Sequence, residues 1–383
     1  MVKRQSVAYN SGMSDLNRMI YQSTAGAKEH LQTASRTIYF GADITASALH
    51  PGNMIGLLVL RELQKQGHQI ILLLGGGTTL IGDPTGRTEE RPLLSRETIK
   101  KNIVGIEKSM RLVLGDGARV VNNEDWLCKI SWMEMLREVG TKMSINKLVK
   151  TDTFQNRLNN NQHLSFLEFS YPICQAYDFL YLNTHYGCTV QCGGSDQWAN
   201  ILAGVGLADG LFGITVPLLT DANGNKISKS TYGDAAWINP DLTSAFDLWQ
   251  WYRNLPDSAA TQLNQWFLIS ESTEINVIKA DIANYMTAII HGEQGAKLAA
   301  EKSNKIFTEG AVAEFPEVSV ENNLQLFEVL VTLNFARSKS AARRLIRQGS
   351  VVINGAVCME ECMIPPKPSV VQVGKKGRRL IAQ

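Results

Sequence analysis

The chain has 383 residues, of which 44% are hydrophobic and 19% are charged. This composition excludes wholesale disorder and a fibrous repeat, and the length suffices for two or three domains with a sizeable core. The formal net charge of +2 hides an asymmetry, because residues 328–383 carry ten basic and three acidic side chains. A basic C-terminal region on a mildly acidic body is typical of proteins that bind polyanions, nucleic acid first.

Residues 36–83 show the alternation of strand, helix and strand that is typical of a parallel α/β sheet. Residues 37–40 predict a strand, and a helical stretch from about 52 to 66 is ended by Gly67. Residues 69–74 form an unbroken apolar run, which indicates a strand buried on both faces. The alternation resumes later in the chain. Residues 189–192 predict a strand, a helix follows from about residue 197, and residues 214–219 predict another strand.

The pattern changes to helical over residues 239–307 and then to a small mixed unit. A helix is predicted around 324–333, and Ser338 is placed to cap a basic helix that Gly349 ends. Asn354-Gly355 between two short apolar runs predicts a hairpin, because these residues accept the positive φ of a type I′ turn.

The number of cysteines and the length of the apolar runs indicate where in the cell the protein is located. Six cysteines are too few for a disulfide scaffold. The pairs Cys188/Cys192 and Cys358/Cys362 each enclose three residues, and no nearby histidine completes a zinc pattern. We therefore expect reduced thiols in a cytoplasmic protein, with an organellar matrix as the alternative. No run approaches the roughly 20 apolar residues of a membrane span, so we expect no membrane partner.

Two motifs suit the binding of phosphates. Between Tyr39 and Asn53 a predicted strand leads into a helix, whose free N–H groups and positive end form an anion site. His50 and Asn53 lie in the first turn of that helix and can donate hydrogen bonds. The stretch 223–230 carries two lysines three residues apart among glycine and serine. Taken alone, a simple helix-starting turn and a solvated loop explain the two motifs about as well.

Two further clusters combine polar groups. Tyr171, Gln175 and Asp178 are spaced at i, i+4 and i+7, so one helix face would carry a phenol, an amide and a carboxylate. An amphipathic surface helix is the simpler interpretation. Residues 191–198 place two glycines, an acid and an amide at the end of a predicted strand. The glycine-rich stretch 75–87 matches neither a dinucleotide fingerprint nor a Walker A loop, and we interpret it as a loop at the carboxyl end of a strand.

In this order the four clusters resemble the tyrosyl-tRNA synthetases of bacteria and organelles, which are class I aminoacyl-tRNA synthetases. Residues 50–53 are similar to the HIGH motif of that family, and Lys226–Ser230 to its KMSKS motif. Residues 167–178 and 194–198 are similar to its tyrosine-binding core. Residues 338–346 with 352–355 resemble an S4 RNA-binding unit. The resemblance extends from about residue 35 to the end of the chain.

The resemblance implies an α/β fold: a Rossmann-like parallel-sheet catalytic domain, then an α-helical domain and a small α+β S4-like domain. The expected parts are an N-terminal extension (1–35), the catalytic domain (36–236), the helical anticodon-side domain (237–309), a linker (310–322) and the S4-like domain (323–383). Family members are homodimers, and the resemblance places the interface in an insertion at about 125–165.

The implied activity is that of a tyrosine–tRNA ligase. It joins L-tyrosine to ATP, releases pyrophosphate, and transfers the tyrosyl group to the 3′-terminal adenosine of tRNA(Tyr). ATP would be a substrate accompanied by Mg²⁺, which its phosphates bind. No tightly bound cofactor and no metal-binding side chains are expected. Both steps depend on positioning and charge stabilisation rather than on a nucleophilic side chain.

The resemblance assigns roles to individual residues. The catalytic set around the phosphates would be Thr45, His50, Asn53, Lys226 and Lys229. ATP binding would also involve Gly41, Asp43, Gly52, Gly194, Asp196, Lys229 and Ser230. The α-ammonium of tyrosine would be held by Asp83, Tyr171 and Gln175, its carboxyl region by Gln197, and its phenol by Tyr39 and Asp178. The tRNA contacts would be Arg87, near the phosphates or the tRNA end, and Arg337, Lys339, Arg343, Arg344 and Arg347.

Three positions depart from the family pattern. Asn53 replaces the second histidine of HIGH, although an amide can still donate to a phosphate. Ile44 stands where proline is usual, and we expect it to loosen the turn. Phe40 stands where a small or thiol side chain is expected near the ribose. Two alternatives remain open: a tryptophanyl-tRNA synthetase, and an RNA-binding splicing helper built on a synthetase scaffold.

Overall fold

The computed structural model describes residues 17–85, 93–227, 236–307, 314–321, 324–364, 368–374 and 376–382. These residues form two compact units. The first unit contains the described residues up to 227, with 237–243 and 255–278. The second contains residue 236, residues 244–254 and the described residues from 279 onward. The domain boundaries expected from the sequence stay a prediction.

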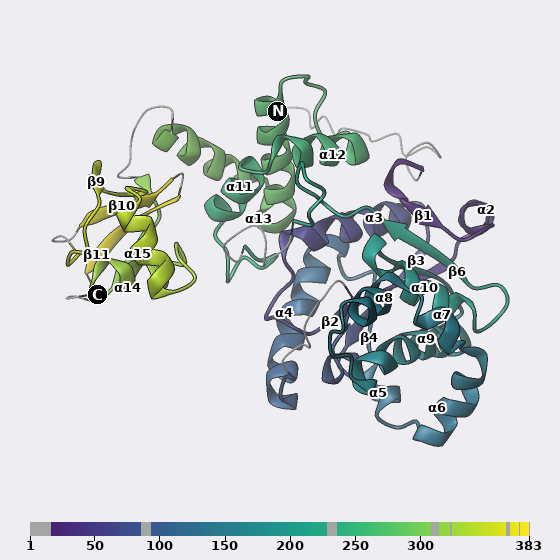
Figure 1. Ribbon diagram of the computed structural model, residues 1–383. Helices are drawn as coiled ribbons and strands as arrows, with labels where there is room; N and C mark the ends of the chain where they lie inside the picture. The colour runs from purple at the N-terminus through teal and green to yellow at the C-terminus, as the bar shows by residue number, and fades with distance from the viewer. Residues whose placement is uncertain are drawn as a thin grey trace. The chain divides into compact units, whose positions relative to one another are not determined.

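The first unit is built on a six-stranded sheet with the order β1-β6-β5-β2-β3-β4 (Figure 1). Its strands are β1 (Gln22–Ser23), β2 (Thr37–Asp43), β3 (Gln69–Gly75), β4 (Arg119–Asn122), β5 (Cys188–Gly194) and β6 (Phe212–Val216). All pairs are parallel except β1 with β6. The chain builds β2, β3 and β4 in one direction and β5 and β6 in the other, so the strand order reverses between β2 and β5. The predicted Rossmann-like fold is confirmed.

Helices connect the parallel strands, because two parallel strands can be joined only by a long crossover connection, which is usually an α-helix. The helices of this unit are α2 (Ala27–Thr33), α3 (Met54–Lys65), α4 (Arg96–Leu114), α5 (Glu124–Leu127), α6 (Trp132–Glu138), α7 (Ile145–Leu148), α8 (Asp152–Asn159), α9 (Phe166–Tyr186), α10 (Trp198–Val205) and α12 (Asp257–Phe267). The first two turns of α3 are buried on every side, and β3 is buried on both faces beside it. This apolar pair anchors the turn between β2 and α3, where the first motif lies.

The second unit combines helices with a five-stranded sheet. Its helices are α11 (Ala245–Arg253), the greater part of α13 (Ile275–Phe307), α14 (Leu326–Thr332) and α15 (Lys339–Arg347). The α13 segment changes direction at Gly292, whose φ is 76°. The strands are β7 (Glu317–Val320), β8 (Val351–Ile353), β9 (Ala356–Cys358), β10 (Ser369–Val373) and β11 (Lys376–Ala382), in the order β7-β11-β10-β8-β9. Helices α14 and α15 pack on this sheet through one apolar core.

The local predictions for this unit hold, but its long-range pairing was not predicted. Asn354 and Gly355 have φ angles of 49° and 86°, as the hairpin of β8 and β9 requires, and Ser338 Oγ accepts from the N–H of Ala341 to cap α15. Residues 317–320, assigned to the linker, instead form β7, which pairs in parallel with β11. This four-residue strand follows Pro316 and is too short to show a clear hydrophobic alternation in the sequence. It is stabilised by pairing with the distant strand β11.

Within the part of the chain that the structure describes, no helix has both the length and the apolar character needed to cross a membrane.

Candidate active site

A pocket of about 390 Å³ opens at the carboxyl ends of β2 and β5, where the strand order reverses. Open α/β sheets bind their ligands at such a point, because the loops there diverge to opposite faces. The lining includes most of the predicted substrate-binding residues: Tyr39, Gly41, Asp43, Thr45, His50, Gly52, Asn53, Asp83, Tyr171, Gln175, Asp178, Gly194, Asp196, Gln197 and Lys226. The predicted residues Arg87, Lys229 and Ser230 lie outside the described residues.

The innermost end of the pocket presents a phenol and a carboxylate. Tyr39 is 1% exposed, and its hydroxyl has no hydrogen-bond partner among the described residues. Burial, with Asp178 nearby, raises the pKa of Tyr39 well above its ordinary value. The Asp178 carboxylate accepts from Asn123 Nδ2 at 2.9 Å and from Trp126 Nε1 at 2.7 Å. These two donors fix the carboxylate in an orientation that the sequence did not reveal.

The pKa of Asp178 reflects a balance of opposing effects. The net effect raises the pKa of Asp178 to about 7: burial raises it most, the hydrogen bonds from Asn123 and Trp126 lower it, and the Asp43 carboxylate raises it. The group therefore titrates near neutral pH, which is unusual for an aspartate.

Asp43 connects the two sides of the pocket. Its Oδ1 accepts from Thr78 Oγ1 at 2.8 Å, and its Oδ2 accepts from the Tyr171 hydroxyl at 3.0 Å. Thr78 Oγ1 in turn accepts from Asn123 Nδ2 at 3.1 Å. A continuous chain of hydrogen bonds thus runs from Asp178 through Asn123 to Asp43 and Tyr171, and it holds β2, the loop after β3 and α9 together.

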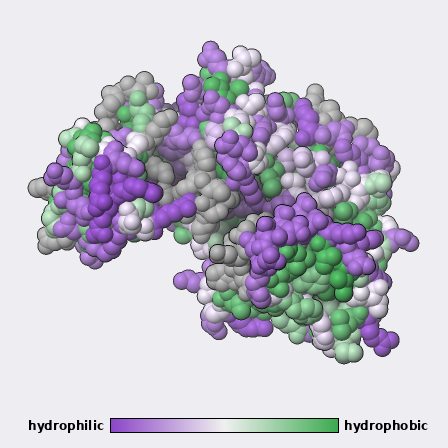
Figure 2. All heavy atoms as spheres, in the orientation of Figure 1, coloured by the Kyte–Doolittle hydropathy of each residue, from purple (hydrophilic) through white to green (hydrophobic). Residues whose placement is uncertain are grey.

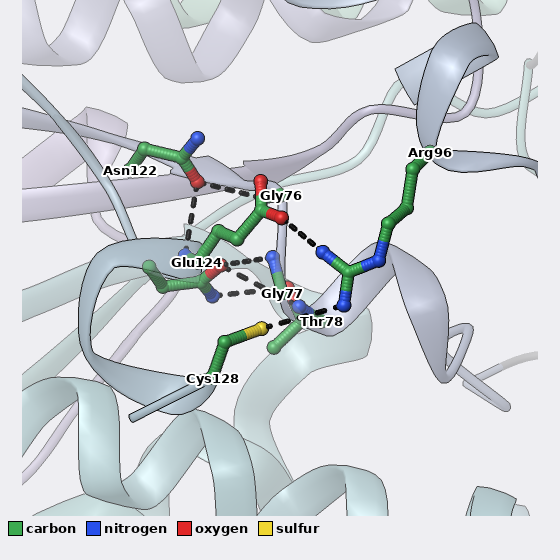
Figure 3. A network of polar contacts seen from close by, with 8 residues as sticks. Gly76, Gly77, Thr78, Arg96, Asn122, Glu124 and Cys128 are labelled. Atoms are coloured by element: carbon green, nitrogen blue, oxygen red, sulfur yellow. Dashed lines mark hydrogen bonds and ion pairs between the residues drawn. The ribbon is translucent and has the colours of Figure 1, made fainter. Parts of the chain in front are cut away.

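Asn122 and Asn123, at the end of β4, anchor the glycine-rich loop that follows β3. Asn122 Oδ1 accepts from the backbone N–H of Gly76 at 3.2 Å and of Glu124 at 3.0 Å (Figure 3). Asn123 Oδ1 accepts from Gly77 N–H at 2.7 Å. A Cβ at Gly76 would collide with Asn122, so glycine is required there. Nearby, Arg96 is paired with Glu124 and lies 3.8 Å from Cys128 Sγ (Figure 3).

A second network lies at the mouth of the pocket. Asp83 Oδ1 accepts from Thr85 N–H at 2.9 Å, and its Oδ2 accepts from Gln197 Nε2 at 2.8 Å. Asn200 Nδ2 donates to Gln175 Oε1 at 3.0 Å and to Gln197 Oε1 at 3.1 Å. Asn200 is buried on α10 and was missed, because one asparagine two positions after a tryptophan carries no recognisable pattern. It fixes both amides relative to Asp83.

The two signature motifs meet at Gly52. His50 Nδ1 accepts from Gly52 N–H at 3.1 Å, and Asn53 Oδ1 accepts from His50 N–H at 3.1 Å, a reciprocal cap of the helix start. A Cβ at Gly52 would lie 3.0 Å from the carbonyl oxygen of Ile227. Glycine therefore permits the Lys226–Ile227 backbone to pass over the first motif. Lys226 Nζ itself lies 2.7 Å from Asp196 Oδ2.

Comparison with known proteins shows the family of this chain. The family described as tRNA synthetases class I (W and Y) matches residues 31–308. A tyrosine–tRNA ligase SYY-like C-terminal domain matches residues 307–364. The tyrosine–tRNA ligase of Zymomonas mobilis is 41% identical over 95% of this chain and 93% of its own, and that of Rickettsia massiliae is 40% identical over 92% and 90%. The chain belongs to the tyrosine–tRNA ligases.

A solved structure supports the same assignment. A C-terminally truncated mitochondrial tyrosyl-tRNA synthetase of Aspergillus nidulans has a TM-score of 0.64 and 28% sequence identity, and the match covers 77% of this chain and 94% of that one. These relatives favour the tyrosine family over the tryptophan alternative. This member is therefore an aminoacyl-tRNA ligase.

Two of the departures from the family pattern have a structural account in this ligase. The N–H of Ile44 donates to Thr79 Oγ1 at 2.7 Å. Proline could not make this bond, so the position ties the turn instead of loosening it as expected. The ring of Phe40 lies against α3 at Gly56, where a Cβ would come within 3.0 Å of Phe40 Cε2. The missing side chain of Gly56 makes room for the ring.

Apart from Arg87, the predicted tRNA-binding residues of the ligase lie on or beside α15. Arg337, Lys339, Arg344 and Arg347 are exposed, and Arg343 is half-buried. Several have acidic partners: Lys339 Nζ lies 2.8 Å from Glu328 Oε1, and Arg343 Nε donates to Glu361 Oε2 at 3.0 Å. Figure 2 shows hydrophilic side chains over this part of the second unit. The surface is cationic, but some of its positive side chains already form ion pairs with glutamates of the same unit.

Within the described ranges, no three histidine, cysteine, aspartate or glutamate side chains come close enough together to hold a metal ion. The six cysteines are free thiols.

Proposed function

We propose that this ligase activates L-tyrosine with ATP and then transfers the tyrosyl group to the 3′-terminal adenosine of tRNA(Tyr). The observation that carries the proposal is the innermost end of the pocket, which is lined by the buried Tyr39 hydroxyl, the fixed Asp178 carboxylate and the apolar side chain of Leu73. A phenol that donates to Asp178 and accepts from Tyr39 satisfies both groups. Phenylalanine would leave the buried Tyr39 hydroxyl without a partner, at a cost of about 1–3 kcal/mol, and would deprive Asp178 of one hydrogen bond.

The polar mouth of the pocket suits the amino-acid end of the substrate. The Tyr171 hydroxyl donates to Asp43, so its oxygen lone pairs face the pocket as acceptors for an ammonium group. Asp83 supplies a negative charge, and Asn200 orients the amide of Gln175 beside it. Gln197 donates to Asp83 and accepts from Asn200, and in this proposal it would contact the carboxyl region of the substrate.

The other side of the pocket suits ATP. The helix start at His50 and Gly52 supplies backbone N–H groups and positive potential for the phosphates. Asn53 uses its oxygen in the helix cap, so its amide N–H₂ is the donor for a phosphate. Lys226 pairs with Asp196, and an entering triphosphate would compete for this lysine and leave Asp196 for the ribose. Gly41, Gly194 and Thr45 line the same side. Lys229 and Ser230 complete this set as predictions from the sequence.

The activation step forms a bond between the tyrosine carboxylate oxygen and the α-phosphorus of ATP, and it breaks the bond to the departing pyrophosphate. The protein contributes position and positive charge, since no side chain becomes covalently attached. In the second step the terminal ribose hydroxyl of tRNA attacks the tyrosyl carbonyl, and AMP leaves. Mg²⁺ would enter with ATP and be held mainly by its phosphates, since the described residues bring no three histidine, cysteine or acidic side chains together to hold a metal ion.

Two surfaces support tRNA binding. The basic residues of α15, with Arg337, would contact phosphates, as the resemblance implies. A second pocket of about 1030 Å³ shares Thr85 and Asp196 with the reaction pocket. It is lined by Lys142, Lys147 and Lys150 and by Trp198. Lysines beside an aromatic ring suit a single-stranded RNA end, and we assign this pocket to the acceptor end of tRNA.

A homodimer is supported by exposed apolar side chains on α6, α8 and α9: Trp132, Met133, Leu136, Leu158, Phe166 and Leu167. The rings of Trp132 and Phe166 meet edge to face at 6.2 Å, and Figure 2 shows apolar side chains gathered on this part of the first unit. A patch of this kind marks an interface. Part of it falls within the expected interface region at 125–165. Free thiols are consistent with a cytoplasmic or organellar location.

The dimer is tested by Phe166→Asp, which places a charge in a side chain that is 67% exposed. Light scattering after size exclusion should give twice the chain mass of 42.3 kDa for the natural protein and the single mass for the variant. Val104→Asp on α4, 70% exposed and outside the patch, is the matched control and should stay dimeric. A natural protein that is monomeric at micromolar concentration would refute the interface.

The activity itself is tested by pyrophosphate exchange with each amino acid. Exchange that depends on tyrosine supports the proposal. Exchange that depends on tryptophan and not on tyrosine would instead support the sister activity. A protein that binds structured RNA but forms no aminoacyl-adenylate would support the RNA-binding alternative.

A further inference from the structure

Two thiols meet in the loop that follows β9. Cys358 Sγ and Cys362 Sγ lie 3.7 Å apart, both partly buried against the core of α14, α15 and the small sheet. Cys188 and Cys192 have the same spacing in sequence but lie on the extended strand β5. Four residues of strand span about 13 Å, so that pair cannot meet. The contact of Cys358 with Cys362 therefore comes from the turn of the loop and not from the spacing.

One end of this loop is fixed to α14. The carbonyl oxygen of Cys362 accepts from Leu326 N–H at 2.9 Å, and Met363 pairs with Gln325. At the other end Cys358 belongs to β9. The residues between the two thiols are thus held at both ends of a short turn.

The same loop brings an acid to the basic helix. Glu361 Oε2 accepts from Arg343 Nε at 3.0 Å, and Glu361 Oε1 lies 3.8 Å from an Arg347 nitrogen. The Arg343 guanidinium also stacks over the Phe327 ring, 4.0 Å from its centroid. A phosphate of RNA would need the same guanidinium donors, so Glu361 and RNA compete for them.

We propose that Cys358 and Cys362 form a reversible disulfide that holds Glu361 against Arg343 and Arg347 and so weakens the binding of tRNA to α15. This inference rests on the proposed tRNA-binding role of α15. The sulfur atoms would close from 3.7 Å to the bonded distance of about 2.05 Å, a small movement within one turn. The bond would restrict the loop, so RNA could displace Glu361 less readily.

The oxidant is a low-molecular-weight disulfide such as glutathione disulfide. The thiolate of one cysteine attacks a glutathione sulfur, forms a mixed disulfide and releases one glutathione thiolate, which takes up a proton. The second cysteine, as its thiolate, then displaces the other glutathione. Two protein thiols and one glutathione disulfide thus give one protein disulfide and two glutathione thiols. Burial, and then the neighbouring Cys358 thiol, raise the pKa of Cys362 to about 11, so the Cys362 thiolate is scarce at neutral pH.

The experiment uses the full chain, reduced or treated with glutathione disulfide. Peptide mass analysis should find the Cys358–Cys362 bond, and tRNA(Tyr) should bind about threefold to tenfold more weakly after oxidation, reversibly with a dithiol reductant. Cys362→Ser should remove this response. Cys128→Ser, which alters an exposed thiol outside the pair, should retain it. Tyrosine-dependent pyrophosphate exchange should not change in Cys362→Ser, since the pair lies outside the reaction pocket.

Glu361→Gln separates the mechanism from a general effect of oxidation. This variant should still form the disulfide but should bind tRNA equally before and after oxidation. A missing disulfide, a disulfide without loss of affinity, or a full response in Glu361→Gln would each overturn the inference. If the reduced protein binds tRNA equally well after Arg347→Ala, the role of α15 fails, and the inference fails with it. If Arg347 is needed but oxidation has no effect, the inference alone fails.

Discussion

The reaction pocket and the basic surface of α15 use charged side chains in opposite ways. Asp178 is 1% exposed, and fixed donors from Asn123 and Trp126 hold it in place. Glu361 has a 37% exposed side chain and pairs with arginines that water also reaches. A buried group that loses its partner pays the full cost of desolvation, whereas an exposed pair is worth about 0–1 kcal/mol. The pocket is therefore suited to discriminating one substrate, and the surface to adjustable affinity.

The pocket and the α15 surface also differ in the number of contacts that hold each charged side chain in place. In the pocket, Asp43, Thr78 and Asn123 share hydrogen bonds, so that moving one side chain disturbs its neighbours. On the surface, Lys339 pairs with Glu328, and Arg343 and Arg347 share Glu361, all through flexible side chains. Substitutions should therefore have large and specific effects in the pocket, and small and salt-dependent effects on α15.

The largest effect is expected for Asp178→Ala. This change removes the acceptor for the substrate phenol, leaves Trp126 Nε1 buried without its acceptor, and leaves Asn123 Nδ2 bonded to Thr78 Oγ1 but not to a carboxylate. Tyrosine-dependent exchange should fall by about a hundredfold to a thousandfold, while tRNA binding persists. Thermal melting identifies any loss of folding, and Asp178→Asn, which preserves volume, should lose activity with a smaller loss of stability. Unchanged activation kinetics in both variants would refute the assignment.

An intermediate effect is expected from pH. The pKa of Asp178 is raised to about 7, and the ionised form is the one that accepts from the substrate phenol. Lowering the pH through 7 protonates the group, so the KM for tyrosine should rise about tenfold between about pH 8 and about pH 6. The KM for ATP over the same range is the internal control. An equal change in both constants would show that Asp178 does not govern the profile.

The smallest effect is expected at α15. Arg344→Ala and Arg347→Ala should each weaken tRNA(Tyr) binding about threefold to tenfold and reduce the slope of log affinity against log salt by about one. Tyrosine activation should be unchanged. Lys65→Ala, an exposed lysine of α3 that pairs with Glu62, is the matched control and should leave the slope as it is. A slope unaffected by either arginine would remove α15 from the tRNA-binding surface.

Many residues of the pocket could be predicted from the sequence, because strand alternation and helix periodicity relate residues that are close together in the chain. The alternation of β2 places Tyr39, Gly41 and Asp43 on one face, and all three line the pocket. The i, i+4 and i+7 spacing on α9 brings Tyr171, Gln175 and Asp178 to the same wall. What was missed are the partners that hold these groups, Asn123, Trp126 and Asn200, which belong to other elements. Their side chains meet the predicted ones only after the sheet has formed.

The sequence by itself determined the elements whose signals lie within a few residues: the turn between β2 and α3, the cap of α15 at Ser338, and the hairpin at Asn354-Gly355. Turn conformation and hydrophobic periodicity depend on residues that are neighbours in the chain, so short stretches of sequence suffice to predict them. Tertiary structure alone decided that β7 pairs with β11, that Asn123 orients Asp178, and that Cys358 meets Cys362 while Cys188 and Cys192 lie along a strand. Such contacts join residues through packing and loop closure, which no local pattern records.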